Sequence, residues 1–328
     1  MRRRLGSAVV VAAASLVVTA CASPAYRYQP SAPVSPGQVG PAKPAAVHAT
    51  LSAAPQSVLG VYGGGVPKSY ARVNKFAEAI GRQPNVVMYF SGWGAGFQTS
   101  FAQAARQHGA VPFVELQPTT VSMAAIASGS QDFYLRKYAE AVRSFGHPVM
   151  IGFAHEMNGF WYQWGWTHTK PKVFISAWRH VVRVFRAVGA DNVTWLWIVN
   201  GIATGEAPIH EWWPGAKYVT WVGIDAYYDW PTQTFDNVFQ PTLADIRGFT
   251  RKPVLIAETG VGPVAGQAAK LPGLFAGIRD RHLLGLVYYD KTQNSGIYHQ
   301  DWAIDRDPAA VAAFRAGVRA TYKARRAP

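Results

Sequence analysis

Glu156 stands directly after an apolar segment and immediately before a group of aromatic residues. Residues Pro148 to Ala154 form an apolar run that predicts a buried strand, and Asn158-Gly159 behind it is a turn signal. Aromatic side chains follow at positions 160–162 and 164. Because an apolar environment disfavours the charged form of a carboxyl group, the sequence predicts a raised pKa for Glu156, as a general acid needs at neutral pH.

The preceding residue, His155, does not make this segment a zinc-protease motif. That motif requires a second histidine at the position occupied by Gly159. No other group of His or Cys residues has the spacing of metal ligands, so we expect neither a catalytic metal nor a cofactor.

Strand and helix patterns alternate from about residue 56 onward. The predicted strands are Val58–Tyr62, Val86–Phe90, Val111–Leu116, Val149–Ala154, Val193–Val199, Tyr218–Tyr227, Val254–Glu258 and Gly285–Tyr289. Helical patterns cover Ser69–Ile80, Gln98–His108, Phe133–Phe145, Pro171–Val188, Phe235–Phe249, Gly266–His282 and a last segment from Pro308 to about Arg325. These elements predict one α/β domain over residues 56–328, a single (β/α)8 TIM barrel. A doubly wound parallel sheet is the alternative, although it normally has fewer strands.

Five of the 18 acidic residues lie at or near the ends of predicted strands, namely Glu115, Glu156, Asp225, Glu258 and Asp290. Chemistry in such barrels is located at the C-terminal ends of the strands. Glu156 ends the fourth strand and Glu258 the seventh, and such a pair can hydrolyse a glycosidic bond: one carboxyl protonates the leaving oxygen while the other attacks or activates water. For each acid alone, a helix cap or an ion-pair partner is an equally good explanation.

At these residues the sequence resembles glycoside hydrolase family 26. His155-Glu156-Met157-Asn158-Gly159, followed by Trp161 and Trp164-Gly165, is similar to the family's acid/base signature. The resemblance continues in Trp221-Val222-Gly223-Ile224-Asp225-Ala226-Tyr227 and Ala257-Glu258-Thr259-Gly260, and covers the chain from about Val58 to the last helix. This family is best known for β-mannanases and includes β-1,3-1,4-glucanases and β-1,3-xylanases. The resemblance implies an endo-β-glycosidase, with β-1,4-mannan as the first expectation for its polysaccharide substrate.

The resemblance also implies roles for individual residues in a retaining double displacement. Glu156 would be the acid/base, Glu258 the nucleophile, Tyr227 a hydrogen-bond donor to Glu258, and His155 a positioning group. Strand periodicity separately places Asp225 and Tyr227 on one face of the sixth strand, beside Glu258. A phenol hydrogen bond is expected to favour the ionised form of Glu258, opposite to the shift predicted for Glu156.

Aromatic residues after the predicted strands indicate a carbohydrate substrate, because their flat faces can stack on pyranose rings. The predicted substrate-binding residues are His155, Trp161, Trp164, Tyr227, Trp93, Asp225 and Tyr289, with Trp166 and Trp230 as further aromatic candidates. For any single tryptophan, packing in the core is an equally good explanation. The eighth strand ends at Tyr289, where we expect a tryptophan platform, so the sequence leaves the choice among β-glycans open.

The start of the chain predicts export. Arg2-Arg3-Arg4 precede an apolar segment, Val9 to Val18, that is short for a membrane span. Val18-Thr19-Ala20-Cys21 resembles a bacterial lipobox, which predicts removal of residues 1–20 and a lipid anchor on Cys21 in the bacterial membrane. Ordinary secretion with cleavage after Ala22 is the alternative. Residues 21–55, rich in Pro, Ala and Ser, predict a flexible tether.

Removal of this leader lowers the formal net charge from +14 to +11. We expect a solvated basic surface on a monomer, attracted at most to an anionic envelope, and no binding of nucleic acid by an exported protein. Two alternatives to a mannanase remain open. One is a β-1,3-1,4-glucanase or a hydrolase of the host's own envelope glycan; the other is an envelope lipoprotein that binds glycan without cleaving it.

Overall fold

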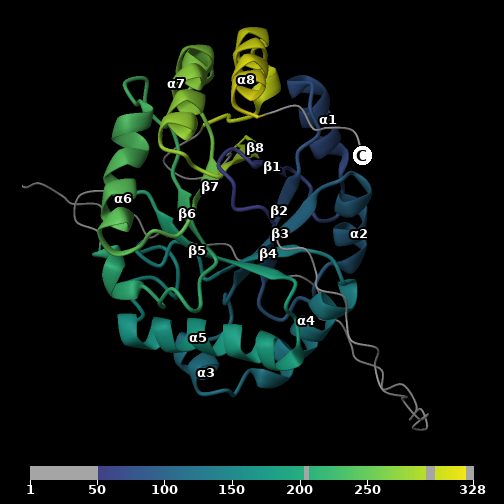
Figure 1. Ribbon diagram of the computed structural model, residues 1–328, viewed down its shortest axis with the longest axis vertical. Helices are drawn as coiled ribbons and strands as arrows, with labels where there is room; N and C mark the ends of the chain where they lie inside the picture. Colours follow the sequence, from purple (N-terminus) through teal and green to yellow (C-terminus); the bar gives the residue numbers. More distant parts are fainter. Residues whose placement is uncertain (1–50, 203–206, 293–299, 323–328) are drawn as a thin grey trace, which may run out of the picture. The chain divides into compact units, whose positions relative to one another are not determined.

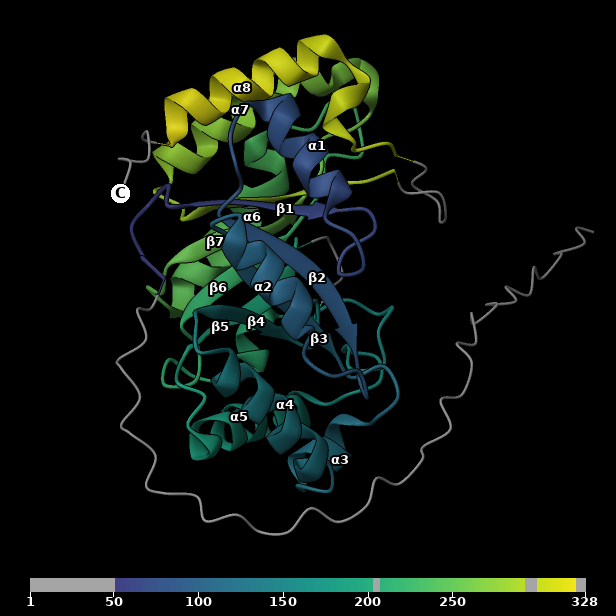
Figure 2. The ribbon, with the colours of Figure 1, turned by 90° about the vertical axis from the view of Figure 1, so that its right-hand side faces the viewer.

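The computed structural model describes residues 51–202, 207–292 and 300–322. The predicted leader, Cys21 and most of the predicted tether lie outside these ranges. Eight parallel strands close into a barrel in sequence order, and the last strand pairs with the first. The helices lie around the outside of this barrel (Figure 1, Figure 2). The predicted (β/α)8 fold is therefore confirmed.

The strands follow the predicted segments closely. They are β1 Val58–Gly63, β2 Val86–Gly92, β3 Val111–Gln117, β4 Val149–Phe153, β5 Val193–Asn200, β6 Trp221–Asp225, β7 Val254–Thr259 and β8 Gly285–Asp290. Strand β6 starts later than predicted, because residues 216–218 form a turn before it. The strand ends at Asp225, so Tyr227 lies just beyond it.

The helices also agree with the periodicity of the sequence. They are α1 Ala71–Ile80, α2 Thr99–Gln107, α3 Met123–Ala127, α4 Asp132–Phe145, α5 Pro171–Val188, α6 Phe235–Phe249, α7 Gln267–Asp280 and α8 Pro308–Thr321, with 3-10 turns η1 Ile209–Trp212, η2 Val264–Gly266 and η3 Ile304–Arg306. Helix α3 is too short for its apolar spacing to be noticed, and it begins where Ser122 Oγ accepts a hydrogen bond from Ala125 N at 3.1 Å. Among the described helices, none has the length and apolar character needed to cross a membrane.

Apolar side chains fill the barrel and also the layer between strands and helices. Side chains such as Met88, Phe113 and Met150 from neighbouring strands meet inside the barrel. The outer layer is larger, and α5 contributes Trp178 and Phe185 to it from one face of an amphipathic helix. Both faces of the strands are therefore packed against apolar side chains.

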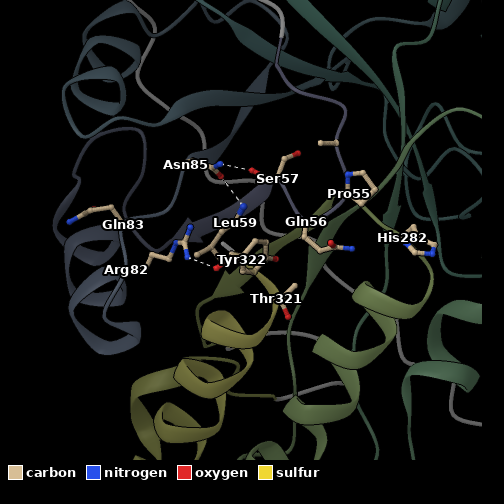
Figure 3. A pocket seen from close by; sticks show the side chains of 11 residues that line it. Pro55, Gln56, Ser57, Leu59, Arg82, Gln83, Asn85, His282, Thr321 and Tyr322 are labelled. Atoms are coloured by element: carbon tan, nitrogen blue, oxygen red, sulfur yellow. Dashed lines mark hydrogen bonds between the residues drawn. The ribbon is translucent and has the colours of Figure 1, made fainter. Parts of the chain in front are cut away.

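Polar side chains hold the N-terminal end of the barrel together (Figure 3). Asn85, just before β2, accepts a hydrogen bond from Leu59 N at 2.8 Å and donates from Nδ2 to Ser57 O at 2.6 Å. Arg82 donates from Nη1 to Tyr322 O at 2.9 Å. These residues line a pocket of about 620 Å³ at the end where the strands begin. In barrel enzymes this end contributes to stability, whereas the opposite end carries the chemistry.

We therefore expect Asn85→Ala to destabilise the protein and to leave its activity unchanged. The substitution leaves backbone groups of Leu59 and Ser57 without their partners, which lowers the free energy of unfolding by about 1–3 kcal/mol. Urea or thermal unfolding measures this change. Gln83→Ala, two residues earlier and exposed, is the control and should unfold like the wild type. Equal stability of the two variants would contradict the assignment.

Candidate active site

The parallel strands bring the predicted chemical groups to one end of the barrel. Glu115 lies near the end of β3, and His155 and Glu156 directly follow β4. Asp225 ends β6 and lies opposite Glu258 of β7 in the strand register. These groups are at the C-terminal ends of the strands, away from the pocket shown in Figure 3.

The backbone after β4 has an unusual conformation. Ala154 and Glu156 have φ angles of 50° and 52°, in the left-handed region that is unfavourable for residues other than glycine. Asn158 holds this turn, because its Nδ2 donates to Asn200 O and its Oδ1 accepts from Asn200 N, both at 2.9 Å. Backbone strain of this kind clusters at functional sites. Here the left-handed backbone conformation sets the direction in which the Glu156 side chain points.

Glu156 lies at the boundary between protein and solvent. Its side chain is partly exposed, and its Oε2 accepts a hydrogen bond from Trp161 Nε1 at 2.9 Å. The backbone N–H of Glu156 donates to Ile198 O at 3.0 Å. The carboxyl group is therefore accessible to a ligand, and the indole of Trp161 orients it.

Glu258 is more deeply enclosed and only 6% exposed. The Tyr227 hydroxyl donates a hydrogen bond to Glu258 Oε2. This hydrogen bond lowers the pKa of Glu258, as predicted, but burial and then the nearby Glu115 carboxyl outweigh it and raise that pKa well above its usual value. Burial, and then the charge of Glu258, raises the pKa of Asp225 in the same way.

Four polar side chains lie in series beside one another, and we call Tyr162, His155, Glu115 and Glu258 the His155 network. His155 Nε2 lies 3.0 Å from Tyr162 Oη, and His155 Nδ1 lies 2.9 Å from Glu115 Oε2. A carboxyl oxygen of Glu115 and one of Glu258 lie within 4.8 Å of each other. Burial lowers the pKa of His155, so its imidazole is neutral at pH 7.

The same residues have side-chain nitrogen and oxygen atoms of the kinds that bind divalent cations in proteins. The relevant atoms of Glu115, His155 and Glu258 all lie within 4.8 Å of one another. Both imidazole nitrogens, however, already face partners, Tyr162 and Glu115, and a cation would have to displace one of them. We therefore describe the group as a cluster of polar side chains, and the prediction that no metal is needed stays a prediction.

Aromatic rings cover the site on the side of β8. Tyr289 stacks on Tyr62 with ring centroids 4.5 Å apart, and Trp302 packs on Tyr227 at 4.6 Å. Trp302 approaches Gly260 so closely that a Cβ at that position would lie 2.4 Å from the indole. Trp302, on the connection between β8 and α8, is 4% exposed and supports Tyr227 from behind.

Further aromatic side chains are exposed on the loops after β4 and β6. They are Phe160, Trp161, Trp166 and Trp230. The Trp230 backbone is held in place, since Lys270 Nζ donates to its carbonyl at 2.7 Å and Gln233 Oε1 accepts from its N–H at 2.9 Å. Exposed rings on a fixed backbone beside carboxyl groups are suited to stacking on sugars.

Some predicted binding residues are enclosed by protein. Trp164 is 2% exposed and donates from Nε1 to His155 O at 2.6 Å, and Asp225 is 0% exposed. Trp93 is partly buried and donates from Nε1 to Gln131 Oε1 at 3.1 Å. We assign Trp164 and Asp225 to the support of the site and not to direct contact with sugar.

Several residues of the site are not singled out by the sequence as binding or catalytic residues. These are Tyr62, Glu115, Tyr162 and Trp302. Glu115 is visible in the sequence only as an acid at a strand end. Trp302 lies outside every recognisable motif, and only the closed barrel shows that it meets Tyr227.

Comparison with known proteins gives three findings. A model of the family described as "Glycosyl hydrolase family 26" matches residues 122–262, which include Glu156 and Glu258. Endoglucanase H of Acetivibrio thermocellus is 28% identical over 273 residues, 77% of this chain and 29% of the relative. A mannan endo-1,4-beta-mannosidase of Bacillus subtilis (strain 168) is 25% identical over 192 residues, 52% of this chain and 50% of the relative. The chain thus spans at most about half the length of these two relatives.

Solved structures show the same fold. A Cellulomonas fimi endo-beta-1,4-mannanase, solved as a double mutant, superposes with a TM-score of 0.64 at 16% identity, covering 81% of this chain and 71% of that chain. At this identity the likeness concerns the barrel alone. The match to the family model and the sequence relatives make the chain similar to glycoside hydrolase family 26, and the solved structures share its barrel fold.

Proposed function

We propose that this chain is an exported retaining endo-β-glycosidase that hydrolyses a β-linked polysaccharide, with β-1,4-mannan as the first candidate. One observation carries the proposal: Glu156, which follows β4, and Glu258, near the end of β7, lie at the same end of one parallel barrel in different surroundings. Glu156 is partly exposed and bonded to an indole, whereas Glu258 is enclosed and bonded to a phenol. Two carboxyl groups that face one site in unlike environments are suited to separate acid and nucleophile roles.

In the first chemical step, a carboxylate oxygen of Glu258 forms a bond to the anomeric carbon. Glu156 gives its proton to the glycosidic oxygen, the bond to that oxygen breaks, and the leaving sugar departs with the proton. The Trp161 N–H keeps the Glu156 carboxyl directed toward the bond that breaks. The Tyr227 O–H fixes Glu258 for attack.

In the second step, Glu156 acts as a base. It takes a proton from water, the water oxygen bonds to the anomeric carbon, and the electron pair of the broken bond returns to Glu258. The Tyr227 hydroxyl stabilises the carboxylate as it leaves. Two displacements at the same carbon retain its configuration.

Two substrates have specific support. The mannan endo-1,4-beta-mannosidase relative and the endo-β-1,4-mannanase structure favour mannan. A β-glucan is the second candidate, because the match to Endoglucanase H extends over 273 residues against 192 for the mannosidase. Tyr289, in place of a tryptophan at the end of β8, is a second reason to retain it.

The test is a substrate screen with the purified protein. Mannan, mixed-linkage β-glucan, xylan and arabinogalactan are supplied separately, and NMR follows the anomer that appears first. We expect one β-glycan to be cleaved internally with retention. Inversion would remove the nucleophile role of Glu258, and binding without cleavage of any glycan would favour a non-catalytic glycan-binding lipoprotein.

Export to the cell envelope is part of the same proposal. We expect Cys21→Ala to release the protein from membranes and to preserve its activity on soluble substrate, because each buried CH₂ of a lipid chain contributes about 0.8 kcal/mol to anchoring. Fractionation followed by immunoblotting measures the change, and Ser23→Ala is the control. If both variants fractionate like the wild type, simple secretion or another anchor replaces lipidation.

A further inference from the structure

Exposed basic side chains gather at the end of the barrel where the strands begin. Because the strands are parallel and helices alternate with them, the last turn of each long helix and the segment that leads to a strand lie at this end. Among the described residues, the exposed bases of these segments that form no ion pair are Arg106, Arg143, Arg186, Lys217, Arg251 and Arg319. We call the surface formed by these residues the basic end.

Hydrogen bonds to backbone carbonyls hold some of these charges in place. Arg143 Nη1 donates to the carbonyl of the last residue of α5 at 3.4 Å, and Arg186 Nη2 donates to Lys217 O at 2.9 Å. A carbonyl oxygen has no net charge, so these bonds position the guanidinium groups without neutralising them. Arg281, at the same end of the barrel, differs because it pairs with Asp236 at 3.4 Å, and it is not counted in the basic end.

The helix dipole favours bases at these positions, but it does not cancel their charge. Each helix end carries about half a negative charge, which is less than the full positive charge of one base. Lys217 lies in the turn before β6 and is not in the last turn of any α-helix. The exposed carboxylates in the same segments are Glu78, Asp191 and Asp280. They are fewer than the bases, so the basic end remains positive.

The exposed apolar side chains lie at the opposite end. In the part of the chain that the structure describes, the large ones are Phe133, Phe160, Trp161, Trp166 and Trp230. Each lies between the end of a strand and the first turn of the following long helix, which is the side of the catalytic carboxyl groups. The basic end is therefore suited to adsorption on an anionic surface by charge, without insertion of apolar side chains.

We propose that the basic end docks on the surface of a membrane that contains anionic phospholipids, with the catalytic carboxyl groups on the side away from the bilayer. The bases come from the ends of α2, α4, α5 and α8 and from the segments before β6 and β7, so they form a broad surface that fits a plane of lipid headgroups. The chain also enters the barrel at this end, at Pro55–Ser57. A tether limits the distance to a membrane, whereas the charge sets the orientation. This inference goes beyond hydrolysis and does not depend on it.

The first test measures binding of the purified Cys21→Ala protein, so that no lipid anchor contributes. Cosedimentation compares vesicles of phosphatidylcholine with vesicles that also contain phosphatidylglycerol. We expect binding to the anionic vesicles alone at an ionic strength of about 0.1 M, and its loss at about 1 M, where the Debye length falls to about 3 Å. Failure to bind the anionic vesicles, or binding that survives the higher salt concentration, would overturn the proposal.

A triple variant, Arg106→Gln/Lys217→Gln/Arg319→Gln, tests whether the basic end carries the binding. A base near an anionic membrane strengthens binding by about fivefold, so loss of three bases should lower the partition coefficient by about 100-fold. Circular dichroism and thermal unfolding verify that the variant is folded. If it is not folded, the three single variants replace it, each with an expected loss of about fivefold.

The matched control is Lys68→Gln/Lys170→Gln/Lys172→Gln. It removes the same charge from exposed positions between a strand end and the first turn of a helix, at the opposite end of the barrel. Its partition coefficient should stay within about fivefold of the Cys21→Ala protein. Equal partition coefficients for the two triple variants would attribute the binding to net charge alone and would remove the role of the basic end.

A second measurement tests the orientation. Cys21 is the only cysteine of the sequence, so the Cys21→Ala protein accepts a fluorophore at one introduced cysteine. Gln83→Cys places it beside the pocket at the end where the strands begin (Figure 3), and Thr120→Cys places it after β3 at the other end. We expect an acceptor-labelled lipid to quench the fluorophore at position 83 more strongly. Equal quenching, or stronger quenching at position 120, would contradict the orientation.

A soluble anionic polymer is the competing partner for a basic surface. A glycerol-phosphate polymer is therefore added in place of vesicles, and binding is followed by the same fluorophores. Binding to this polymer together with no binding to anionic vesicles would overturn membrane docking and assign the basic end to an envelope polymer. The vesicle result stands whether or not the protein cleaves a glycan, so failure of the proposed hydrolysis and failure of docking are distinguishable.

Discussion

Glu258→Ala is expected to abolish hydrolysis of every substrate that the wild type cleaves, including aryl glycosides with acidic phenols. Without the Glu258 carboxylate no bond to the anomeric carbon can form, and a better leaving group does not replace a missing nucleophile. We expect kcat to fall by at least about 10⁴-fold, as for other enzymes that lose their nucleophile. Initial rates on the best glycan from the screen and on the aryl glycoside measure the loss.

The matched control for this variant is Glu140→Ala. Glu140 is an exposed glutamate on α4, away from the strand ends, and its replacement should leave kcat unchanged. Thermal unfolding distinguishes loss of chemistry from loss of fold. A Glu258→Ala variant that is folded and still active would refute the assignment of the nucleophile.

Glu156→Ala is expected to show a different pattern. On natural glycans, loss of the proton donor should lower kcat/KM by about 10²–10⁴-fold. On the aryl glycoside the first step needs no proton, so the glycosyl-enzyme should form and accumulate. Its hydrolysis is slow because Glu156 also activates water. Added azide needs no base and should restore turnover, giving a glycosyl azide of retained configuration.

The comparison of the two variants assigns the roles. A burst of phenol release followed by slow turnover is expected for Glu156→Ala and not for Glu258→Ala. If Glu258→Ala gives the burst and the rescue by azide, the roles are reversed. If neither substitution affects hydrolysis, the catalytic site lies elsewhere, and the glycan-binding reading of the site gains support.

The fold was predictable because the patterns that define its strands and helices are local in the sequence. Each strand is a short apolar run, and helices such as α5 show their buried face every third or fourth residue. Because strands and helices alternate along the chain, only a few topologies are possible. Helix α3 was missed for the same reason, since five residues are too few for a period to appear.

The position of Glu156 and Glu258 was also predictable, because a strand end is a local property and parallel strands end together. The raised pKa of Glu258 was not predictable from the sequence. Its pKa depends on Glu115, which is distant in sequence and becomes a neighbour only when the barrel closes. The Tyr227 hydrogen bond exists as expected, but its effect is smaller than burial.

Asp290 shows the limit of counting acids at strand ends. It is as buried as Glu115, yet Arg72 Nε lies 2.6 Å from its Oδ2 and Ile304 N donates to its Oδ1 at 2.9 Å. Its surroundings make it a structural ion pair. Sequence position alone cannot separate it from Glu115, because the difference lies in whether a cation from another element reaches the carboxyl group.

The position of the N-terminal end of the barrel, which polar side chains hold together, affects how the protein can be attached to a surface, a resin or another domain. The chain enters the barrel there, at Pro55–Ser57, and the end of α8 at Thr321–Tyr322 borders the same pocket (Figure 3). A surface, a resin or a fused domain joined directly before Pro55 would therefore lie at the face that lacks the carboxyl cluster. The opposite face would remain open to a long, insoluble polymer, so attachment directly before Pro55 should preserve access where attachment through the loops after β4 or β6 would block it.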